Sequence, residues 1–151
     1  MITEKKVKKE KINEVKITLL AVSRNESLAR AYVSAFAAGL DPTLDELADI
    51  RCAVSEAVTN CVVHAYKGWE NPGKIYINAR LYSDRTVTVE VSDRGCGIEN
   101  IEMAMTPLFT TDKEGERSGM GFSVMKSFTD CVRVTSKPSG GTRVFMSKKF
   151  S

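Results

Sequence analysis

The chain has 151 residues, of which 42% are hydrophobic and 27% are charged. This composition is typical of folded globular proteins and excludes wholesale disorder, a collagen-like repeat and a coiled-coil rod. No apolar run reaches the roughly 18–20 residues that cross a bilayer, and the N-terminus lacks the apolar core of a secretory signal. The four cysteines form no C-x-x-C pair, so we expect reduced thiols in a cytoplasmic protein.

The net charge of +3 comes entirely from the lysine-rich residues 1–16, and the remainder of the chain is neutral. A nucleic-acid-binding protein usually carries a basic surface on its folded body, so direct binding of nucleic acid is not expected. We predict a lysine-rich lead-in at 1–14 and a single domain at 15–151, a length that one hydrophobic core can serve.

The spacing of apolar residues predicts the elements in chain order, because alternation is typical of strands and steps of three or four are typical of helices. These are a strand at 15–21, helices at 24–38 and 43–66, strands at 75–81 and 87–91, a short helix at 98–105, a loop at 107–121, a helix at 122–128, and strands at 132–134 and 144–146. Paired strands separated by helices predict a mostly antiparallel sheet that helices cover on one face.

Two short patterns predict how the first two helices begin. Ser23 and Glu26, and likewise Thr43 and Glu46, have the spacing of a capping box, in which the two side chains each satisfy the other residue's free backbone N–H. Gly39 is expected to end the first helix in a left-handed conformation.

Three polar residues follow each other at steps of four in the second predicted helix: Glu56, Asn60 and His64. This spacing places them along one stripe of an α-helix. The Asn oxygen is a hard ligand suited to Mg²⁺, and the Glu carboxylate can accept a proton from an attacking hydroxyl group. Taken alone, the same pattern also fits a solvated polar stripe.

An acidic residue and two glycines follow a hydrophobic strand in the segment Asp93-Arg-Gly95-Cys-Gly97. Glycines allow a ligand to approach the backbone closely. A buried carboxylate needs a donor, and the exocyclic amine of adenine would supply one. The alternative for this segment is an Asx turn that uses glycines for its geometry.

Two later segments carry weaker signals. Thr110, Thr111 and residues 116–121 precede a predicted helix, where successive backbone N–H groups bind anions and Arg117 could donate to a terminal phosphate. Thr142 enters the last strand, where its hydroxyl could bond adenine or Asp93. A flexible loop and a hairpin turn are the respective alternatives. The chain contains no Walker motif.

The order of these motifs resembles that of the GHKL ATPase superfamily. Glu56-Ala-Val-Thr-Asn60 is similar to its N box, Asp93-Arg-Gly-Cys-Gly97 to its G1 box, Gly119-Met-Gly121 to its G2 box, and Gly141-Thr142 to its closing Gly-Thr pair. The resemblance covers roughly residues 15–150 and implies an α/β fold. That fold is a two-layer sandwich in which ATP lies between helices on one face and a mixed, mostly antiparallel sheet.

Longer segments resemble the anti-sigma branch of this superfamily, from spore-forming bacteria: residues 23–30, 40–46, 54–60, 107–111 and 116–122. The resemblance implies a homodimer that binds a sporulation sigma factor of RNA polymerase. It also implies that ATP is used to phosphorylate a serine on an anti-anti-sigma protein.

The resemblance implies roles for individual residues. Asn60 is expected to hold Mg²⁺, Glu56 to act as the catalytic base, Asp93 to read adenine, and residues 107–121 to form the ATP lid. Arg117 is the second expected catalytic residue, and Glu26 and Arg30 are expected to contact protein partners. The other expected cofactor-binding residues are Gly95, Gly97, Thr110, Thr111, Ser118, Gly119, Met120, Gly121 and Thr142.

Two rival functions remain open from the sequence. One is a nucleotide-gated binding module without kinase activity, in which ATP orders the lid and the lid holds a partner. The other is the detached catalytic domain of a histidine kinase.

Overall fold

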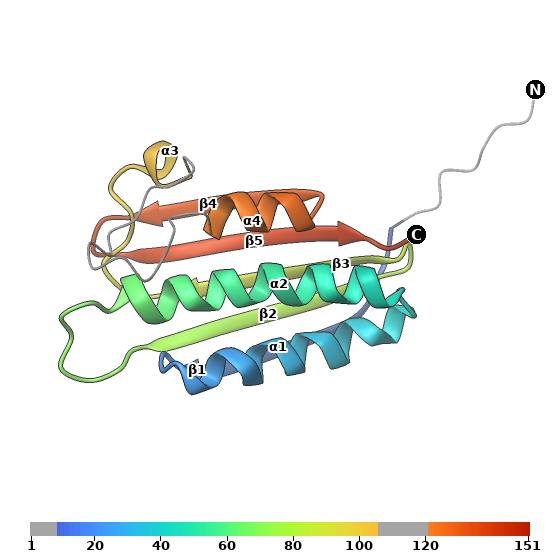
Figure 1. Cartoon of the computed structure of the whole chain (residues 1–151), viewed down its shortest axis with the longest axis horizontal. Helices are drawn as coiled ribbons and strands as arrows, with labels where there is room; N and C mark the ends of the chain where they lie inside the picture. Colours follow the sequence, from blue (N-terminus) through green and yellow to red (C-terminus); the bar gives the residue numbers. More distant parts are fainter. Residues whose placement is uncertain (1–8, 106–120) are drawn as a thin grey trace, which may run out of the picture.

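Over residues 9–105 and 121–151, the part of the chain that the computed structural model describes, five strands form one sheet in the order β1-β2-β3-β5-β4 (Figure 1). The strands are β1 (Lys11–Leu20), β2 (Lys74–Tyr82), β3 (Thr86–Asp93), β4 (Cys131–Lys137) and β5 (Gly141–Lys149). All four pairings are antiparallel. The predominance of antiparallel pairing is confirmed, and the sheet is more uniform than the mixed sheet that the resemblance implies.

Three helices lie side by side over one face of this sheet: α1 (Arg24–Ala37), α2 (Leu44–Asn60) and α4 (Gly121–Phe128) (Figure 1). The central helix, α2, packs against both of the others. Shorter elements complete the order: a 3₁₀ turn η1 (Ala38–Leu40), a π-helical segment η2 (Cys61–Ala65) and a one-turn helix α3 (Ile101–Ala104). No helix in the described ranges is both long and apolar enough to cross a membrane.

The hydrophobic core lies between the helices and the sheet. Because successive strand residues point to opposite faces, alternate positions of β2 and β3 are buried under the helices. They are joined there by apolar side chains of α2 and α4. The set includes Ile75, Ile77, Ala79, Val87, Val89, Val91, Val54, Val58 and Met125. Asp93 continues the alternation of β3 by one step, which places a carboxylate at the end of this buried face.

The two predicted capping boxes have different outcomes. At α2 the box forms: the Glu46 N–H donates to Oγ1 of Thr43 at 3.1 Å, and the Thr43 N–H donates to Oε1 of Glu46 at 3.0 Å. The box at Ser23 is wrong, since this residue has helical backbone angles and its side chain makes no capping bond. Glu26 instead accepts a hydrogen bond from Oγ of Ser55 at 2.7 Å, which ties α1 to α2.

The predicted left-handed stop at Gly39 is also wrong. The chain continues from α1 into the 3₁₀ turn, and the left-handed residue is Asp41, with φ of 52°. Aspartate tolerates this region better than most residues. The following Pro42 disfavours the right-handed helical conformation at position 41.

The first strand begins earlier than predicted, at Lys11 rather than at residue 15. Backbone and side-chain bonds between Glu10 and Ser83 tie this start to the turn between β2 and β3. Part of the expected lead-in at 1–14 therefore belongs to the sheet.

Candidate functional site

The two polar residues of α2 meet the first residue of α4. A Cβ atom at Gly121 would lie 3.3 Å from Oε2 of Glu56 and 3.4 Å from both side-chain amide atoms of Asn60. One helical turn separates Glu56 and Asn60, so both side chains reach the same place. The structure thus brings Glu56 and Asn60 to Gly121, the last residue of the glycine-rich segment. A glycine leaves space there that a larger side chain would fill.

The helix changes its geometry directly after Asn60. Residues Cys61–Ala65 form a single π-helical segment, and such segments often occur at functional sites. Because the turn is wider, the four-residue step from Asn60 to His64 no longer continues the α-helical stripe that the sequence predicted. At the end of this segment, the carbonyl group of Ala65 faces the loop that follows β3, as the contacts below show.

Asp93 is buried at the end of β3, with only 8% of its surface exposed. Its Oδ1 accepts hydrogen bonds from the backbone N–H of Gly95 at 2.9 Å and of Thr142 at 3.2 Å. Its Oδ2 accepts one from the thiol of Cys61 at 3.5 Å. Burial raises the pKa of the Asp93 carboxyl group because it disfavours the charged form, and these three donors oppose the rise.

The two glycines after Asp93 have a reason in the protein's own packing. A Cβ atom at Gly95 would lie 2.0 Å from the carbonyl oxygen of Ala65, and one at Gly97 would lie 2.0 Å from that of Lys137. Between them, Cys96 donates its N–H to Ala65 O at 2.7 Å. The loop is held between η2 and the β4–β5 turn, so close approach of the protein's own backbone already explains both glycines. Their role in cofactor binding stays a prediction.

Thr142 meets Asp93 in a different way from the one predicted. Its backbone N–H, not its hydroxyl group, donates to the carboxylate. The hydroxyl oxygen lies 2.8 Å from Oγ of Ser136, the residue opposite it in the β4–β5 pair. Ser136 also accepts a hydrogen bond from the N–H of Ile98 at 2.7 Å. Apart from its place across from Thr142, Ser136 has no sequence feature that marks it as part of the site.

Tyr66 is a second residue that sequence reasoning missed. Its hydroxyl group accepts a hydrogen bond from the N–H of Arg94 at 2.9 Å and donates to the carbonyl group of Lys74 at 2.5 Å. Burial raises the pKa of this hydroxyl group, so it remains protonated and able to donate. Tyr66 therefore fixes the backbone on the far side of Asp93 from Thr142.

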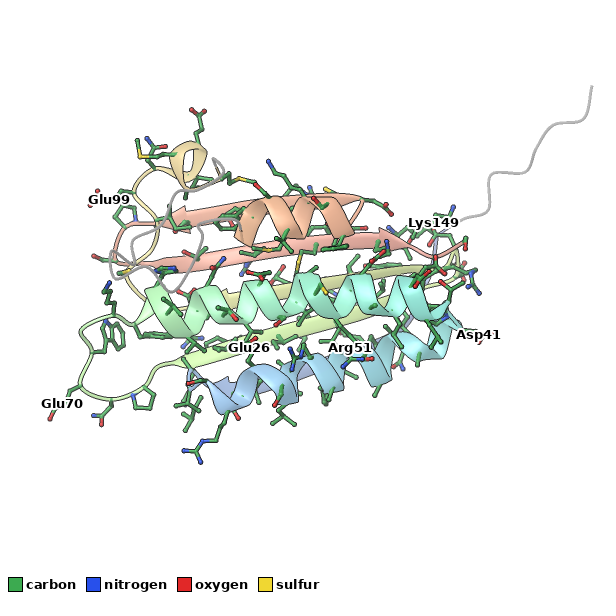
Figure 2. All side chains as sticks on the ribbon, in the orientation of Figure 1. Glu26, Asp41, Arg51, Glu70, Glu99 and Lys149 are labelled. Carbon is green, nitrogen blue, oxygen red and sulfur yellow. The ribbon has the colours of Figure 1, made fainter. Side chains whose placement is uncertain are left out.

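The remaining predicted residues fall into two groups. Thr110, Thr111, Arg117, Ser118, Gly119 and Met120 lie outside the described residues. Glu26 and Arg30 are half-buried on α1, and α2 separates α1 from α4 (Figures 1 and 2). The predicted partner residues thus lie on the opposite side of α2 from Gly121.

The chemistry of the observed groups fits a nucleotide with a bound Mg²⁺. Asn60 offers a hard amide oxygen beside the space at Gly121. Within the described ranges, the donor to Oδ2 of Asp93 is the weak thiol donor of Cys61. Among the described residues, no three His, Cys, Asp or Glu side chains gather to hold a metal ion. A Mg²⁺ ion at Asn60 would therefore also need oxygens from the nucleotide phosphates and from water. Mg²⁺ is commonly held in this way at phosphate-binding sites.

Comparison with known proteins gives consistent results. The Histidine kinase-like ATPase domain family matches residues 21–148. Relatives named Anti-sigma F factor include one from Clostridium acetobutylicum, 50% identical over 139 residues (92% of this chain and 95% of the relative). Another, from Caldanaerobacter subterraneus subsp. tengcongensis, is 54% identical over 136 residues (90% and 93%).

Among solved structures, the RsbU and RsbW domains of a Mycobacterium tuberculosis protein resemble the fold with a TM-score of 0.67 at 24% identity. The match covers 91% of this chain and 32% of that chain.

Proposed function

The chain belongs to the histidine kinase-like ATPase family, and on this premise we propose that it is an ATP-dependent anti-sigma factor with serine kinase activity. In this proposal it binds a sporulation sigma factor of RNA polymerase and phosphorylates a serine on an anti-anti-sigma protein. The observation that carries the proposal is the meeting of Glu56 and Asn60 at Gly121, the first residue of α4. The name shared by relatives that are about half identical over most of the chain supports the choice of partners.

The adenine ring of ATP is assigned to the end of β3. Asp93 is buried, both of its oxygens are held by protein donors, and Oδ2 retains acceptor capacity. Its ionised form can accept a hydrogen bond from the exocyclic amine of adenine. A base with a carbonyl group at that position would bring two acceptors together and would bind more weakly.

The phosphates are assigned to the space between α2 and the N-terminus of α4. A helix N-terminus carries free N–H groups and the positive end of the helix dipole, and Gly121 leaves room for phosphate oxygens. Thr110, Thr111, Ser118, Gly119 and Met120 are proposed to add lid contacts, and Arg117 to donate to the terminal phosphate. Mg²⁺ held by Asn60 would offset the charge that develops as the phosphoryl group moves.

Glu56 is proposed as the base of the transfer reaction. Its carboxylate lies on the same side of α2 as Asn60 and faces Gly121, so it can accept the proton of the substrate serine as the serine oxygen bonds to the terminal phosphorus atom. The bond between that phosphorus atom and the bridging oxygen breaks in the same exchange, and ADP leaves. Proton transfer of this kind requires contact between Glu56 and the hydroxyl group, directly or through one water molecule.

The protein partners are assigned to α1. Glu26 bonds Ser55 of α2, and Arg30 is half-buried one helical turn further along α1, which leaves this region separate from the nucleotide site. The proposal includes a homodimer, as the family resemblance implies. A partner that belongs to RNA polymerase places the proposed activity in the cytoplasm.

Two measurements test the proposal. The full chain is mixed with Mg²⁺, ATP labelled on its terminal phosphate, and the anti-anti-sigma protein of the same organism, and the label is located by peptide mapping. Capture of the sigma factor is measured with and without Mg-ATP. We expect label on a serine of the partner and stronger capture with ATP. ATP-dependent capture without any label would support the binding module without kinase activity, and the absence of both would overturn the proposal.

A further inference from the structure

The carboxylate of Asp93 is held unequally at its two oxygens. Oδ1 accepts two backbone N–H groups, from Gly95 and Thr142. Among the residues that the structure describes, Oδ2 accepts one donor, the thiol of Cys61, at 3.5 Å. Since each carboxylate oxygen can accept about two hydrogen bonds, Oδ2 is the oxygen that retains capacity for a ligand.

Cys61 is placed to act on this oxygen. It is the first residue of the π-helical segment and is 4% exposed. A cysteine thiol is ordinarily protonated at neutral pH, and an ionised carboxylate can only accept, so the S–H group is the donor of this pair. Two consecutive residues thus face different parts of the site: Asn60, the last residue of α2, faces Gly121, and Cys61, the first residue of η2, faces Asp93.

We propose that Cys61 is a positioning residue for the Asp93 carboxylate, with its S–H group directing the open acceptor site of Oδ2 towards the exocyclic amine of a purine. The side-chain torsion that sets the plane of a carboxylate has a broad energy profile, so two bonds to Oδ1 alone leave the position of Oδ2 free to vary. A third donor on Oδ2 restricts that rotation. This inference rests on the proposed function, in which Asp93 reads adenine.

A simpler role for Cys61 is to fill space as a small buried side chain. The two roles differ in what they do to selectivity. A packing defect would weaken the binding of every nucleotide that uses the site. Loss of a positioning bond would weaken only the nucleotides that donate an amine to Oδ2.

The test compares ADP with inosine 5′-diphosphate, which carries a carbonyl group in place of the adenine amine. Dissociation constants are measured by calorimetry in Mg²⁺ for the full-length wild-type chain and for Cys61→Ala. We expect the variant to bind ADP about threefold to tenfold more weakly, the effect of one weak hydrogen bond to a charged group. Its affinity for inosine diphosphate should not change.

Two further variants complete the design. Cys61→Ser keeps a donor of similar size and should restore most of the selectivity. Cys131→Ala removes an exposed thiol at the opposite end of β4 from Ser136 and should leave both affinities at their wild-type values.

The other possible results would overturn either the positioning role of Cys61 or the assignment of Asp93 to adenine. Unchanged selectivity in Cys61→Ala, or an equal loss of affinity for both nucleotides, would overturn the positioning role while the proposed function stands. A wild-type chain that binds the two nucleotides equally well would overturn the assignment of Asp93 to adenine, and this inference with it.

Discussion

The carboxylate of Asp93 and the backbone N–H of Thr142 lie 3.2 Å apart, although 49 positions separate the two residues in the chain. The same oxygen of Asp93 also accepts the N–H of Gly95. One buried side chain therefore joins the end of β3, the loop that follows it and the start of β5. Asp93 thus has a structural role as well as the binding role that we propose for it.

Replacing the carboxylate by an amide tests the binding role. Asp93→Asn can keep an acceptor for the two backbone donors, but an amide N–H in place of Oδ2 would face the adenine amine. We expect ADP affinity to fall about 10-fold to 100-fold, because a hydrogen bond to a charged group contributes about 1.5–3 kcal/mol. Calorimetry measures this loss. The control is Asp41→Asn, which changes an exposed carboxylate. Asp41 lies at the opposite end of the molecule from Glu99, which comes two residues after Gly97 (Figure 2). This variant should bind ADP like wild type.

The same variant gives a prediction about stability and pH. Burial raises the pKa of Asp93 in the folded state, so the folded protein binds a proton more readily than the unfolded chain and the ionised form opposes folding. Above the folded-state pKa, Asp93→Asn should therefore unfold at a higher temperature than wild type. As the pH falls through that pKa towards the unfolded value, wild type gains stability and the difference should narrow. Thermal unfolding across the acid range measures this, and a difference that widens on acidification contradicts the prediction.

Alanine substitutions at Gly141 and Gly68 distinguish the cost of a steric clash from the cost of a strained backbone. Both have positive φ, 87° and 84°. An added Cβ at Gly141 would lie 2.1 Å from the carbonyl oxygen of Asp93, whereas at Gly68 it would meet nothing within 4 Å. Gly68→Ala should lower the free energy of unfolding by about 1–2 kcal/mol, the cost of a left-handed backbone for alanine. Gly141→Ala should lower it by about 1–3 kcal/mol more, because the backbone must also shift.

Chemical denaturation measures both free energies. Equal losses in the two variants would contradict the close packing of Gly141 against Asp93. Gly141→Ala should in addition weaken ADP binding, since the displaced backbone carries the carboxylate, while Gly68→Ala should not.

The sequence predicted the order of the elements and the shared stripe of Glu56 and Asn60 correctly, because periodicity and helical spacing are local properties. The approach of Gly121 to these two residues is not local, and only the family resemblance implied a shared site there. The sequence-based prediction failed where a distant group competes for the same atom. Ser23 and Glu26 have the spacing of a capping box, but Ser55 on another helix binds the Glu26 carboxylate. A four-residue pattern contains no information about that third side chain.

The hydrogen-bond donors to Asp93 could not be predicted from the sequence for a related reason. Backbone N–H groups carry no sequence signature, so the sequence indicates the Thr142 hydroxyl group as a possible partner of adenine or Asp93, whereas the backbone N–H makes the bond. The thiol of Cys61 reaches the carboxylate through a contact between the end of α2 and the end of β3, and apolar spacing does not reveal such a contact. Nor does it reveal the π-helical segment that begins at Cys61, because the spacing of this region fits a continuous α-helix equally well.

The two capping patterns yield a matched pair of variants. Thr43→Ala removes the hydroxyl group that accepts the N–H of Glu46 and should lower the free energy of unfolding by about 1 kcal/mol. Ser23→Ala removes a hydroxyl group at the corresponding position of α1 that makes no capping bond, and it should leave stability nearly unchanged. Equal effects in denaturation experiments would show that the difference between the two helix starts has no energetic consequence.

Glu56→Gln separates chemistry from binding. The amide has almost the same size and still faces Gly121, so ADP affinity should stay close to wild type. It cannot accept a proton, so the rate of phosphoryl transfer to the partner serine should fall at least about 100-fold, the lower bound for loss of a general base. Single-turnover transfer of labelled phosphate measures the rate. Glu70→Gln, in the exposed loop before β2 (Figure 2), is the control and should react at the wild-type rate. Transfer by Glu56→Gln at that same rate would show that Glu56 is not the base, and that its place beside Asn60 serves only to shape the site.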